Sequence, residues 1–434
     1  MPCYDLAVIG GGIAGLGVFE RAARAGLKTV LFERGRPGGA TTAVTSGLLH
    51  GGLRYLPYDV GTSWLMCREI ARLRRERPDL LKRQAFLWPV YRGEHLGLGL
   101  IEALQEEYDL FAPLRGARRH ARLSADESVG ILPGLRREGL LGAVVFDEWR
   151  VDVPGLVASL SEAGRAAGGA LLEGRRAVAL SLGAGRVSSA TVEDGCGARE
   201  EIEARVFVNA AGPWAEEVAR LAGVSSVSLR LRKGVHLVIP GEPPPHGLIF
   251  PGPGGRRIGV YPRENETWVG PTDVPHDGLP EAVRAEPVEA EALRRSLAAV
   301  LPDLAARSCR AVAGLRPIPC QRGASFLLSR EHRVFDHADE GIANFLSLAG
   351  GKLTTYQPMG EDVLAVVLRK LGRPSLPPAV PAEEEHRLPW SLMRPRGRVA
   401  GLASSAGLLA YFAARHALFG GAREGWAAFA GDQR

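Results

Sequence analysis

The chain has 434 residues, 46% of them hydrophobic, and a formal net charge of +6. This length is enough for more than one hydrophobic core, so we expect two intertwined domains of ordinary globular composition. The positive charge suits an anionic substrate or an anionic membrane surface. No recognition motif accompanies it, so we expect no nucleic-acid partner. The five cysteines include no C-x-x-C pair, which argues against a metal site, an iron–sulfur cluster or a disulfide framework.

The chain opens with a strand, a glycine-rich turn and a helix. Apolar residues 6–9 predict a buried strand, and Gly10, Gly12 and Gly15 give the spacing G-x-G-x-x-G before a helix. The first glycine of such a turn makes the bend, the second lets the backbone approach a pyrophosphate, and the third lets helix and strand pack closely. The anion then meets the N-terminus of the helix.

A second strand completes this unit. The helix is expected over about residues 14–25, Gly26 ends it, and "LKTVLF" forms a strand with Glu33 just beyond. Glu33 can accept a hydrogen bond from a ribose hydroxyl. The unit predicts a dinucleotide site in a Rossmann-like α/β domain and leaves NAD and FAD both open. No secretory pattern precedes the first strand, so we expect a cytoplasmic protein.

The following segments alternate between loops, helices and strands. Residues 35–59 are rich in Gly and Thr and then aromatic, which indicates a loop running along the cofactor. Helical spacing follows over residues 64–83 and 103–110, and we expect a helical insertion up to about residue 141. A helix that starts near Pro154 and a strand from about Ala170 come next.

Two later segments, residues 204–223 and 341–372, repeat the order strand, glycine turn and helix. Between them, residues 229–316 contain short β-rich runs bounded by turn residues, which predicts an antiparallel sheet for the substrate. The last glycine turn returns the chain to the cofactor. A single NAD site has little need of this return, whereas an extended FAD can be held at its pyrophosphate by the first turn and near its flavin by the last. The sequence therefore favours FAD.

These elements predict a discontinuous domain organisation. We assign residues 1–63, 145–220 and 310–376 to the FAD-binding domain, and residues 64–144 and 221–309 to a substrate-binding domain with a mixed or antiparallel sheet. Residues 377–434 form a short C-terminal helical tail. Its uncharged stretch is too short for a confident membrane span, which leaves a docking helix or a peripheral contact with the inner face of the cell membrane.

Several separated motifs resemble, in the same order, those of the FAD-dependent glycerol-3-phosphate dehydrogenases, within the superfamily of glycine oxidase and D-amino-acid oxidase. They are "VIGGGIAGLG", "LLHGGLRYL", "VDVPGLV", "VNAAGPWAEEVA", "KGVHLVIP", "GPTDV", "GLRPI" and "GGKLTTY". The resemblance implies noncovalent FAD and oxidation of sn-glycerol 3-phosphate to dihydroxyacetone phosphate. It also implies a quinone or another electron acceptor, and it allows a homo-oligomer or a partner subunit.

The resemblance also assigns roles to residues of this chain. It places His50 beside the flavin and makes His236 a candidate base. It adds Arg316 as a third catalytic residue. The implied substrate contacts are Arg54, Tyr55, Lys233, Thr272, Arg330 and Lys352. The expected cofactor contacts are Gly10, Gly12, Ile13, Ala14, Gly15, Glu33, Arg34, Thr41, Thr42, Ser46, Gly47, Leu49, Ala211, Gly212, Trp214, Gly350, Gly351, Lys352, Leu353 and Thr354.

The chemistry of alcohol oxidation agrees with these roles. A flavin takes a hydride from carbon while a base takes the hydroxyl proton, and either His50 or His236 can be that base. A developing alkoxide gains from a fixed cation, for which we choose Arg316. A phosphate dianion favours guanidinium and ammonium partners together, which Arg54, Arg330 and Lys352 provide.

Two alternatives remain open from the sequence. The same arginines would suit the carboxylate of a 2-hydroxy acid, such as 2-hydroxyglutarate, or of an amino acid. A flavin-binding protein without turnover is the other alternative, and the presence of both histidines together with the arginine set argues against it.

Overall fold

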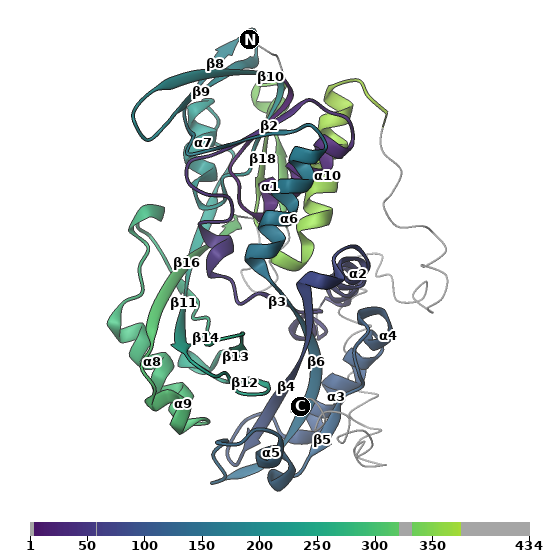
Figure 1. Cartoon of the computed structure of the whole chain (residues 1–434), viewed down its shortest axis with the longest axis vertical. Coiled ribbons are helices and arrows are strands. Elements are labelled where there is room, and N and C mark those ends of the chain that lie inside the picture. The colour runs from purple at the N-terminus through teal and green to yellow at the C-terminus, as the bar shows by residue number, and fades with distance from the viewer. Residues whose placement is uncertain (1–3, 58, 321–331, 375–434) are drawn as a thin grey trace.

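The computed structural model describes residues 4–57, 59–320 and 332–374. Within these residues, two sheets with helices packed on them form an upper and a lower half (Figure 1). The helical tail predicted over residues 377–434 lies outside the described residues. The prediction of a mixed α/β fold is confirmed.

The first sheet has the strand order β17-β18-β10-β1-β2-β7, and β18, β10, β1, β2 and β7 run parallel to one another. An antiparallel hairpin, β8 and β9, continues from the first half of β10. The strands are β1 (Tyr4–Ile9), β2 (Thr29–Glu33), β7 (Ala170–Glu173), β8 (Arg176–Gly183), β9 (Arg186–Glu193), β10 (Arg199–Asn209), β17 (Arg333–Asp336) and β18 (Phe345–Ala349).

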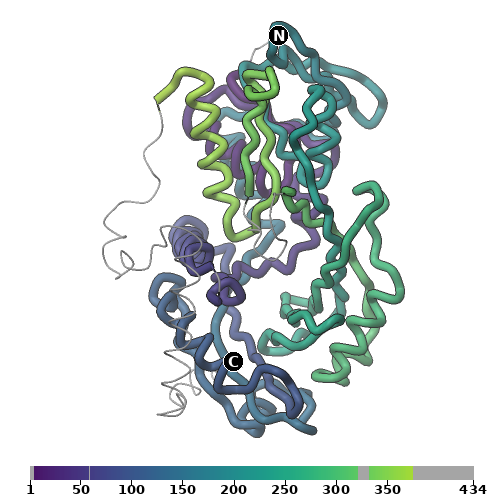
Figure 2. Tube along the Cα trace, turned by 180° about the vertical axis from the view of Figure 1, so that it is seen from behind, coloured from purple at the N-terminus to yellow at the C-terminus, as the bar shows by residue number. Residues whose placement is uncertain are grey.

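Helices cover both faces of this sheet, as a parallel sheet requires. On one face α1 (Ile13–Arg24), α6 (Val153–Ala166) and α10 (Tyr356–Lys370) lie side by side, with their apolar residues in one buried core (Figure 1). On the other face α7 (Ala215–Leu221) packs with the hairpin against a second core. Helix α10 comes from the end of the described chain, yet it lies beside the N-terminal helix, as the yellow and purple segments in Figure 2 show.

The second sheet has the order β15-β11-β14-β13-β12-β4-β6-β3, with β16 paired to β11 and β5 to β6. Its pairs are antiparallel except β12 with β4. The strands are β3 (Leu48–Leu49), β4 (Leu81–Tyr91), β5 (Ala121–Leu123), β6 (Leu140–Val151), β11 (Leu229–Pro240), β12 (Gly247–Pro251), β13 (Arg257–Pro262), β14 (Glu266–Gly270), β15 (Val274–Pro275) and β16 (Arg310–Pro319).

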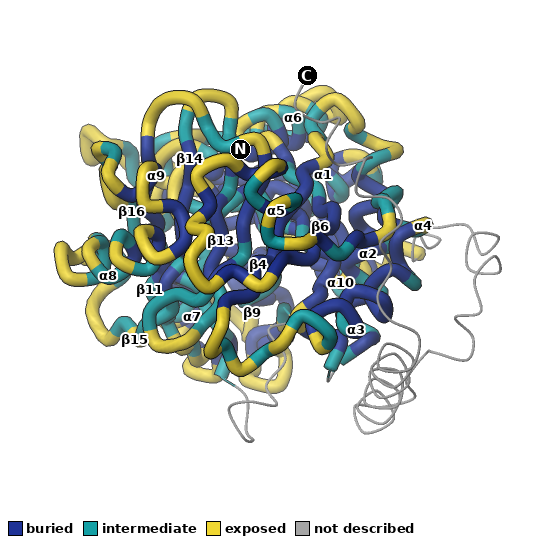
Figure 3. Tube along the Cα trace, turned by 90° about the horizontal axis from the view of Figure 1, so that it is seen from below, coloured by how far each residue is buried: buried dark blue, intermediate teal, exposed yellow. Residues whose placement is uncertain are grey.

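Two further cores fill the space between this sheet and its helices. The helices are α2 (Val60–Glu76), α3 (Leu98–Asp109), α4 (Ala112–Arg115), α5 (Ala125–Ile131), α8 (Pro287–Ala298) and α9 (Pro302–Ala306). Helices α5, α8 and α9 contribute to one core, and α2, α3 and α4 to the other. Seen from below, the segments labelled β4, β6 and α10 are largely buried, and many of the exposed residues lie in the outer loops (Figure 3).

Two predictions about secondary structure were wrong in the region from residue 64 to about residue 141, which the sequence predicted to be a helical insertion. The helix predicted from residue 64 begins at Val60, because the Asp59 carboxylate caps it by accepting from the Thr62 N–H at 3.0 Å. It ends at Glu76, shortly before Pro78, and residues 81–91 form β4 rather than helix. Eight consecutive residues of β4 are buried, and a continuous apolar run does not distinguish a strand from a buried helix.

The sheet pairings also shift one predicted domain boundary. Strand β16 pairs with β11 along its whole length, from Leu229 opposite Pro319 to Val238 opposite Arg310. Residues 310–319 therefore belong to the second sheet, although the sequence placed them with the FAD-binding domain. The predicted boundary between residues 144 and 145 likewise falls inside β6. The rest of the domain division stays a proposal.

Candidate active site

Three glycine-containing turns meet at the carboxyl edge of the first sheet. Strands β1, β10 and β18 are parallel neighbours, so the turns that follow them, at residues 10–12, 210–212 and 350–352, come together. All three turns line one cavity of about 570 Å³, whose walls also include residues of the second sheet. The cavity therefore lies where the two sheets meet.

The first turn has the geometry of a phosphate cradle. Gly10 has φ +105°, and a Cβ there would lie 2.8 Å from the Ala210 carbonyl oxygen. A Cβ at Gly15 would overlap the Gly10 carbonyl oxygen, so α1 can pack this closely only with glycine. The cavity at the N-terminus of α1 is lined by Gly12, Ile13 and Ala14. The first turn of α1 contains no acidic residue. This end of the helix suits a pyrophosphate.

Glu33 holds the turn as well as facing the cavity. Its Oε2 accepts from the Gly11 N–H at 2.7 Å and its Oε1 accepts from the Gly35 N–H at 2.9 Å. Each carboxylate oxygen has a further lone pair, so Glu33 can still accept from a ribose hydroxyl.

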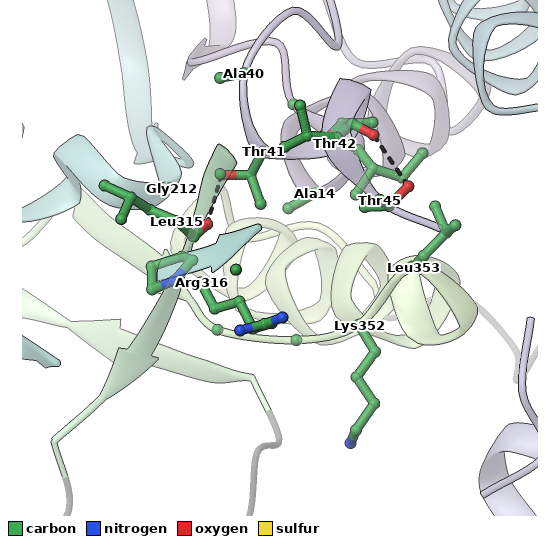
Figure 4. Close-up of a pocket in the computed structure, with 18 of the residues that line it drawn as sticks. Ala14, Ala40, Thr41, Thr42, Thr45, Gly212, Leu315, Arg316, Lys352 and Leu353 are labelled. Carbon is green, nitrogen blue, oxygen red and sulfur yellow. Dashed lines mark hydrogen bonds between the residues drawn. The ribbon is translucent and has the colours of Figure 1, made fainter. Parts of the chain in front are cut away.

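Side-chain contacts hold the segment that follows β2 in place beside the first turn. The Arg34 guanidinium stacks on the Trp214 ring at 3.6 Å and forms an ion pair with Glu281 at 3.1 Å. Thr41 donates to the Leu315 carbonyl at 2.8 Å, which fixes the cofactor loop to β16 (Figure 4). The loop is thus attached to both sheets.

The late turn needs both of its glycines. Gly350 and Gly351 have φ +80° and +91°, a left-handed conformation that side chains disfavour. A Cβ at Gly351 would overlap the Met359 sulfur. The turn therefore packs tightly on α10 and directs Lys352 into the cavity (Figure 4).

Most expected cofactor contacts line the cavity. They are Gly10, Gly12, Ile13, Ala14, Glu33, Arg34, Thr41, Thr42, Ser46, Ala211, Gly212, Trp214, Gly350, Gly351, Lys352, Leu353 and Thr354. Gly15 supports the helix from behind. Gly47 and Leu49 do not line it: the Gly47 carbonyl accepts from the Val151 N–H at 2.9 Å, and Leu49 is fully buried in the core. Its neighbour Leu48 lines the cavity instead.

A cluster of guanidinium groups forms one wall of the cavity. Asp273, almost fully buried, pairs with Arg316 at 3.1 Å, with Arg232 at 2.9 Å and with Arg256. Arg316 reaches this position across Gly234, where a Cβ would lie 2.5 Å from its Nη2. Because one carboxylate serves three cations and Arg256 and Arg316 face the cavity, this wall has a net positive charge. Figure 4 shows Arg316 and Lys352 extending into the same space.

The two histidines occupy different environments. His236 is buried among Trp268 and Tyr261, with ring centroids at 5.2 and 6.4 Å. Burial, together with the nearby Arg316 and Arg263, lowers the pKa of His236 to about 3. Neither ring nitrogen has a hydrogen-bond partner among the described residues, so a neutral imidazole lies at the cavity.

His50 lies at another part of the cavity wall. Its ring is half-buried and stacks on the Tyr55 ring at 6.2 Å. The exposed Arg54 donates from its Nη2 to the Tyr55 hydroxyl at 2.9 Å. The Lys352 ammonium lies 5.0 Å above the Tyr55 ring. His50, Arg54, Tyr55 and Lys352 are therefore brought together at this part of the cavity wall.

Two predicted substrate contacts within the described residues do not line the cavity. Lys233 points to the opposite face of β11, where it pairs with Glu289 at 2.7 Å, because alternate residues of a strand face opposite sides. The Thr272 hydroxyl oxygen accepts from the Val235 N–H at 2.9 Å, which ties the segment between β14 and β15 to β11. Arg330 lies outside the described residues.

Sequence reasoning missed one buried acid at the cavity, Glu148 on β6. Burial raises its pKa to about 7, although the Arg115 guanidinium and the hydrogen bonds from Tyr108 and the Gly51 N–H lower it. The sequence signal was weak, because Glu148 belongs to the charged run "DEWR", which ordinarily indicates a solvated surface.

The chain belongs to the FAD dependent oxidoreductase family, whose model matches residues 5–357. It is an FAD-dependent oxidoreductase, and the expectation of FAD as cofactor is confirmed. The cradle and the late turn described above fit that cofactor.

The chain is also similar to individual proteins named glycerol-3-phosphate dehydrogenases. The chain is 29% identical to a glycerol-3-phosphate dehydrogenase of Synechocystis sp., covering 89% of this chain and 74% of the relative. It is also 29% identical to the aerobic glycerol-3-phosphate dehydrogenase of Bacillus subtilis, and the match covers 85% of this chain and 67% of the relative. The chain matches the solved structure of the glycerol-3-phosphate dehydrogenase from Bacillus halodurans complexed with FAD with a TM-score of 0.67 and 23% identity. The match covers 86% of this chain and 66% of that protein. The chain thus spans about two thirds to three quarters of the length of these proteins, and the resemblance predicted from the motifs is confirmed.

None of the helices in the described residues combines the length and apolar character needed to cross a bilayer.

Proposed function

We propose that the protein oxidises sn-glycerol 3-phosphate to dihydroxyacetone phosphate and passes the electrons to a quinone or another external acceptor. The observation that carries this proposal is the positive wall of the cavity. Arg316 and Lys352 come from β16 and from the late turn, and both extend into the space that the cofactor cradle also borders. A dianionic phosphate ester matches such a wall better than a monoanion does. The names of the two relatives support the same substrate.

The phosphate is proposed to bind at Lys352, with Arg54 at the mouth of the cavity. Arg316 is proposed to face the carbon that is oxidised, because its guanidinium is fixed by Asp273 at 3.1 Å and by a bond to the Thr272 carbonyl at 3.0 Å. A cation held in this way can stabilise a developing alkoxide without reorganisation.

FAD, when bound, supplies the acceptor for the hydride from the carbinol carbon. The hydroxyl proton goes to His50 in this proposal. His236 is a poor acceptor, because its pKa is lowered to about 3 by burial and by nearby arginines. Its neutral ring can instead exchange hydrogen bonds with the substrate. His236 is buried among Trp268 and Tyr261, which exclude water from its ring.

Anaerobic flavin reduction tests the proposal. The holoprotein is mixed with sn-glycerol 3-phosphate, and bleaching of the visible flavin band is followed, with 2-hydroxyglutarate and glycerol in parallel. Bleaching by the phosphate ester alone is the expected result. Reduction by the hydroxy acid alone would contradict the proposal and assign the positive wall to a carboxylate. The Arg316→Ala variant should retain flavin and lose most of its reduction rate, and full turnover in this variant would remove Arg316 from the mechanism.

A further inference from the structure

The peptide that follows His50 is held from both sides by buried side chains. The Gly51 N–H donates to Glu148 Oε2 at 3.1 Å, and the Cys67 thiol donates to the Gly51 carbonyl at 3.3 Å. A Cβ at Gly51 would overlap the Tyr108 hydroxyl. The backbone next to His50 is therefore fixed by residues from β6, α2 and α3.

Glu148 is itself held in a fixed geometry. Its Oε1 accepts from the Tyr108 hydroxyl at 2.7 Å, and Arg115 Nη1 lies 3.9 Å from Oε2. The Arg115 guanidinium stacks on the Tyr108 ring at 3.8 Å and donates to the Asp147 carbonyl at 2.6 Å. Tyr108 and Arg115 are fully buried. The carboxylate thus has little freedom to move away from Gly51.

Glu148 and His50 also border the same cavity. A carboxylate at this place has two physical consequences. It fixes the backbone that sets the direction of the His50 ring, and its negative charge favours a protonated imidazole nearby. Both consequences matter only if His50 takes a proton during turnover.

We propose that Glu148 is a positioning residue for His50, which holds the ring toward the reacting carbon through the Gly51 N–H and, when ionised, stabilises the imidazolium formed on proton transfer. The inference rests on the proposed function in one respect, the choice of His50 as base. Nothing in the motifs that define the family resemblance includes Glu148.

The ionisation of Glu148 makes the inference testable by pH. Its pKa is raised to about 7 by burial. The titratable and charged groups that face it are Tyr108 on α3, Arg115 on α4, Cys67 on α2 and the neighbouring Asp147. The ionised form predominates above about pH 7, so the rate constant for flavin reduction should rise as pH increases through this value.

The decisive variant is Glu148→Gln, because an amide oxygen can still accept from the Gly51 N–H but cannot titrate. Stopped-flow reduction of the holoenzyme, measured between about pH 5.5 and about pH 9, should rise with pH in both proteins, because the base His50 must be unprotonated, and the part of the rise near pH 7 that follows Glu148 should be missing in this variant. The limiting rate should fall by about tenfold while the substrate dissociation constant stays unchanged. Tyr108→Phe should move the rise to higher pH, since it removes a hydrogen bond that lowers the pKa of Glu148.

Glu107→Gln is the matched control. Burial also raises the pKa of Glu107 to about 7, but this residue does not line the cavity and its carboxylate has no hydrogen-bond partner among the described residues. Its variant should keep the wild-type pH profile. A rise that persists unchanged in Glu148→Gln, or its absence from the wild type, would overturn the inference.

Infrared spectroscopy of the resting holoenzyme gives a readout that does not need turnover. The carbonyl stretch of protonated carboxyl groups should weaken as pH rises through about 7 in the wild type. Burial raises the pKa of both Glu148 and Glu107 to about 7, so Glu148→Gln should lack one component of this band and Glu107→Gln another. Identical spectra for the wild type and Glu148→Gln would overturn the inference. Failure of sn-glycerol 3-phosphate to reduce the flavin would instead contradict the proposed function, and the infrared titration would still be interpretable.

Discussion

His236 should make the folded protein sensitive to acid. Its pKa is lowered from 6.5 to about 3 in the folded protein, first by burial and then by Arg316 and Arg263. The unfolded chain therefore binds a proton below pH 6.5 that the folded protein does not bind until about pH 3. The stability contributed by the neutral ring is fully present above about pH 6.5. It is lost as the pH falls below this value, by up to about 1.4 kcal/mol per pH unit.

At about pH 5 this loss amounts to about 2 kcal/mol relative to about pH 8. The value is insensitive to the folded pKa as long as that pKa stays well below 5, because the ring is then neutral in the folded state at both pH values. Other groups also titrate in this interval; Glu148, with its raised pKa, contributes stability at low pH that is lost as pH rises through about 7. A comparison with a variant is therefore needed to isolate His236.

Urea unfolding of the wild type and of His236→Gln, at saturating FAD and at both pH values, provides that comparison. The variant is expected to be the less stable protein at about pH 8, because glutamine fits the aromatic site less well. The stability difference between the two proteins should shrink by about 2 kcal/mol on going to about pH 5. A difference that is the same at both pH values would refute the reasoning. Repeating the titrations at a higher FAD concentration controls for loss of the cofactor.

Two further predictions concern cofactor retention and the different roles of Lys352 and Lys233. Gly15→Ala should purify without flavin, because its Cβ would overlap the Gly10 carbonyl. The control Gly97→Ala should keep its flavin and stay yellow, because Gly97 has open space around it. The ratio of visible to ultraviolet absorbance measures flavin content in both variants, and a yellow Gly15→Ala protein would contradict the role of the first turn as a phosphate cradle. Lys352→Met should raise KM for the phosphate substrate by at least about tenfold, whereas Lys233→Met should lower thermal stability and leave KM unchanged, because Lys233 pairs with Glu289 away from the cavity. Equal effects on KM would refute this assignment.

Much of the first sheet could be predicted from local sequence, because its turns demand particular residues. Gly10 and Gly351 have positive φ values and close neighbours, so these positions require glycine, and the flanking apolar runs mark the strands. The same local reasoning failed for residues 81–91. A strand buried on both faces has no alternation of polar and apolar residues, and its partners β6 and β12 are distant in sequence.

The candidate site was predicted less completely, for a reason that Lys233 and His236 illustrate. Both belong to "KGVHLVIP", and the motif alone does not say which of its residues face the substrate. The position of each residue in strand β11, which pairs with β16, determines the face on which its side chain lies. Gly234 and His236 face the cavity, and Lys233 faces α8. Glu148 was missed because its significance depends on Tyr108, Arg115 and Gly51, which three separate segments bring to it.

Burial acts in the same way on His236 and Glu148, two of the titratable groups that border the cavity. It favours the uncharged form of each, so the pKa of His236 falls to about 3 while that of Glu148 rises to about 7. At neutral pH His236 therefore contributes no charge, and the charge of Glu148 is only partly developed. The positive wall of Arg256 and Arg316, together with Lys352, dominates the field that a ligand meets, because Asp273 offsets only part of it. This wall should therefore attract an anionic ligand. A guanidinium cannot accept a proton, so in the proposed oxidation the hydroxyl proton goes to a group outside the arginine wall, for which we propose His50.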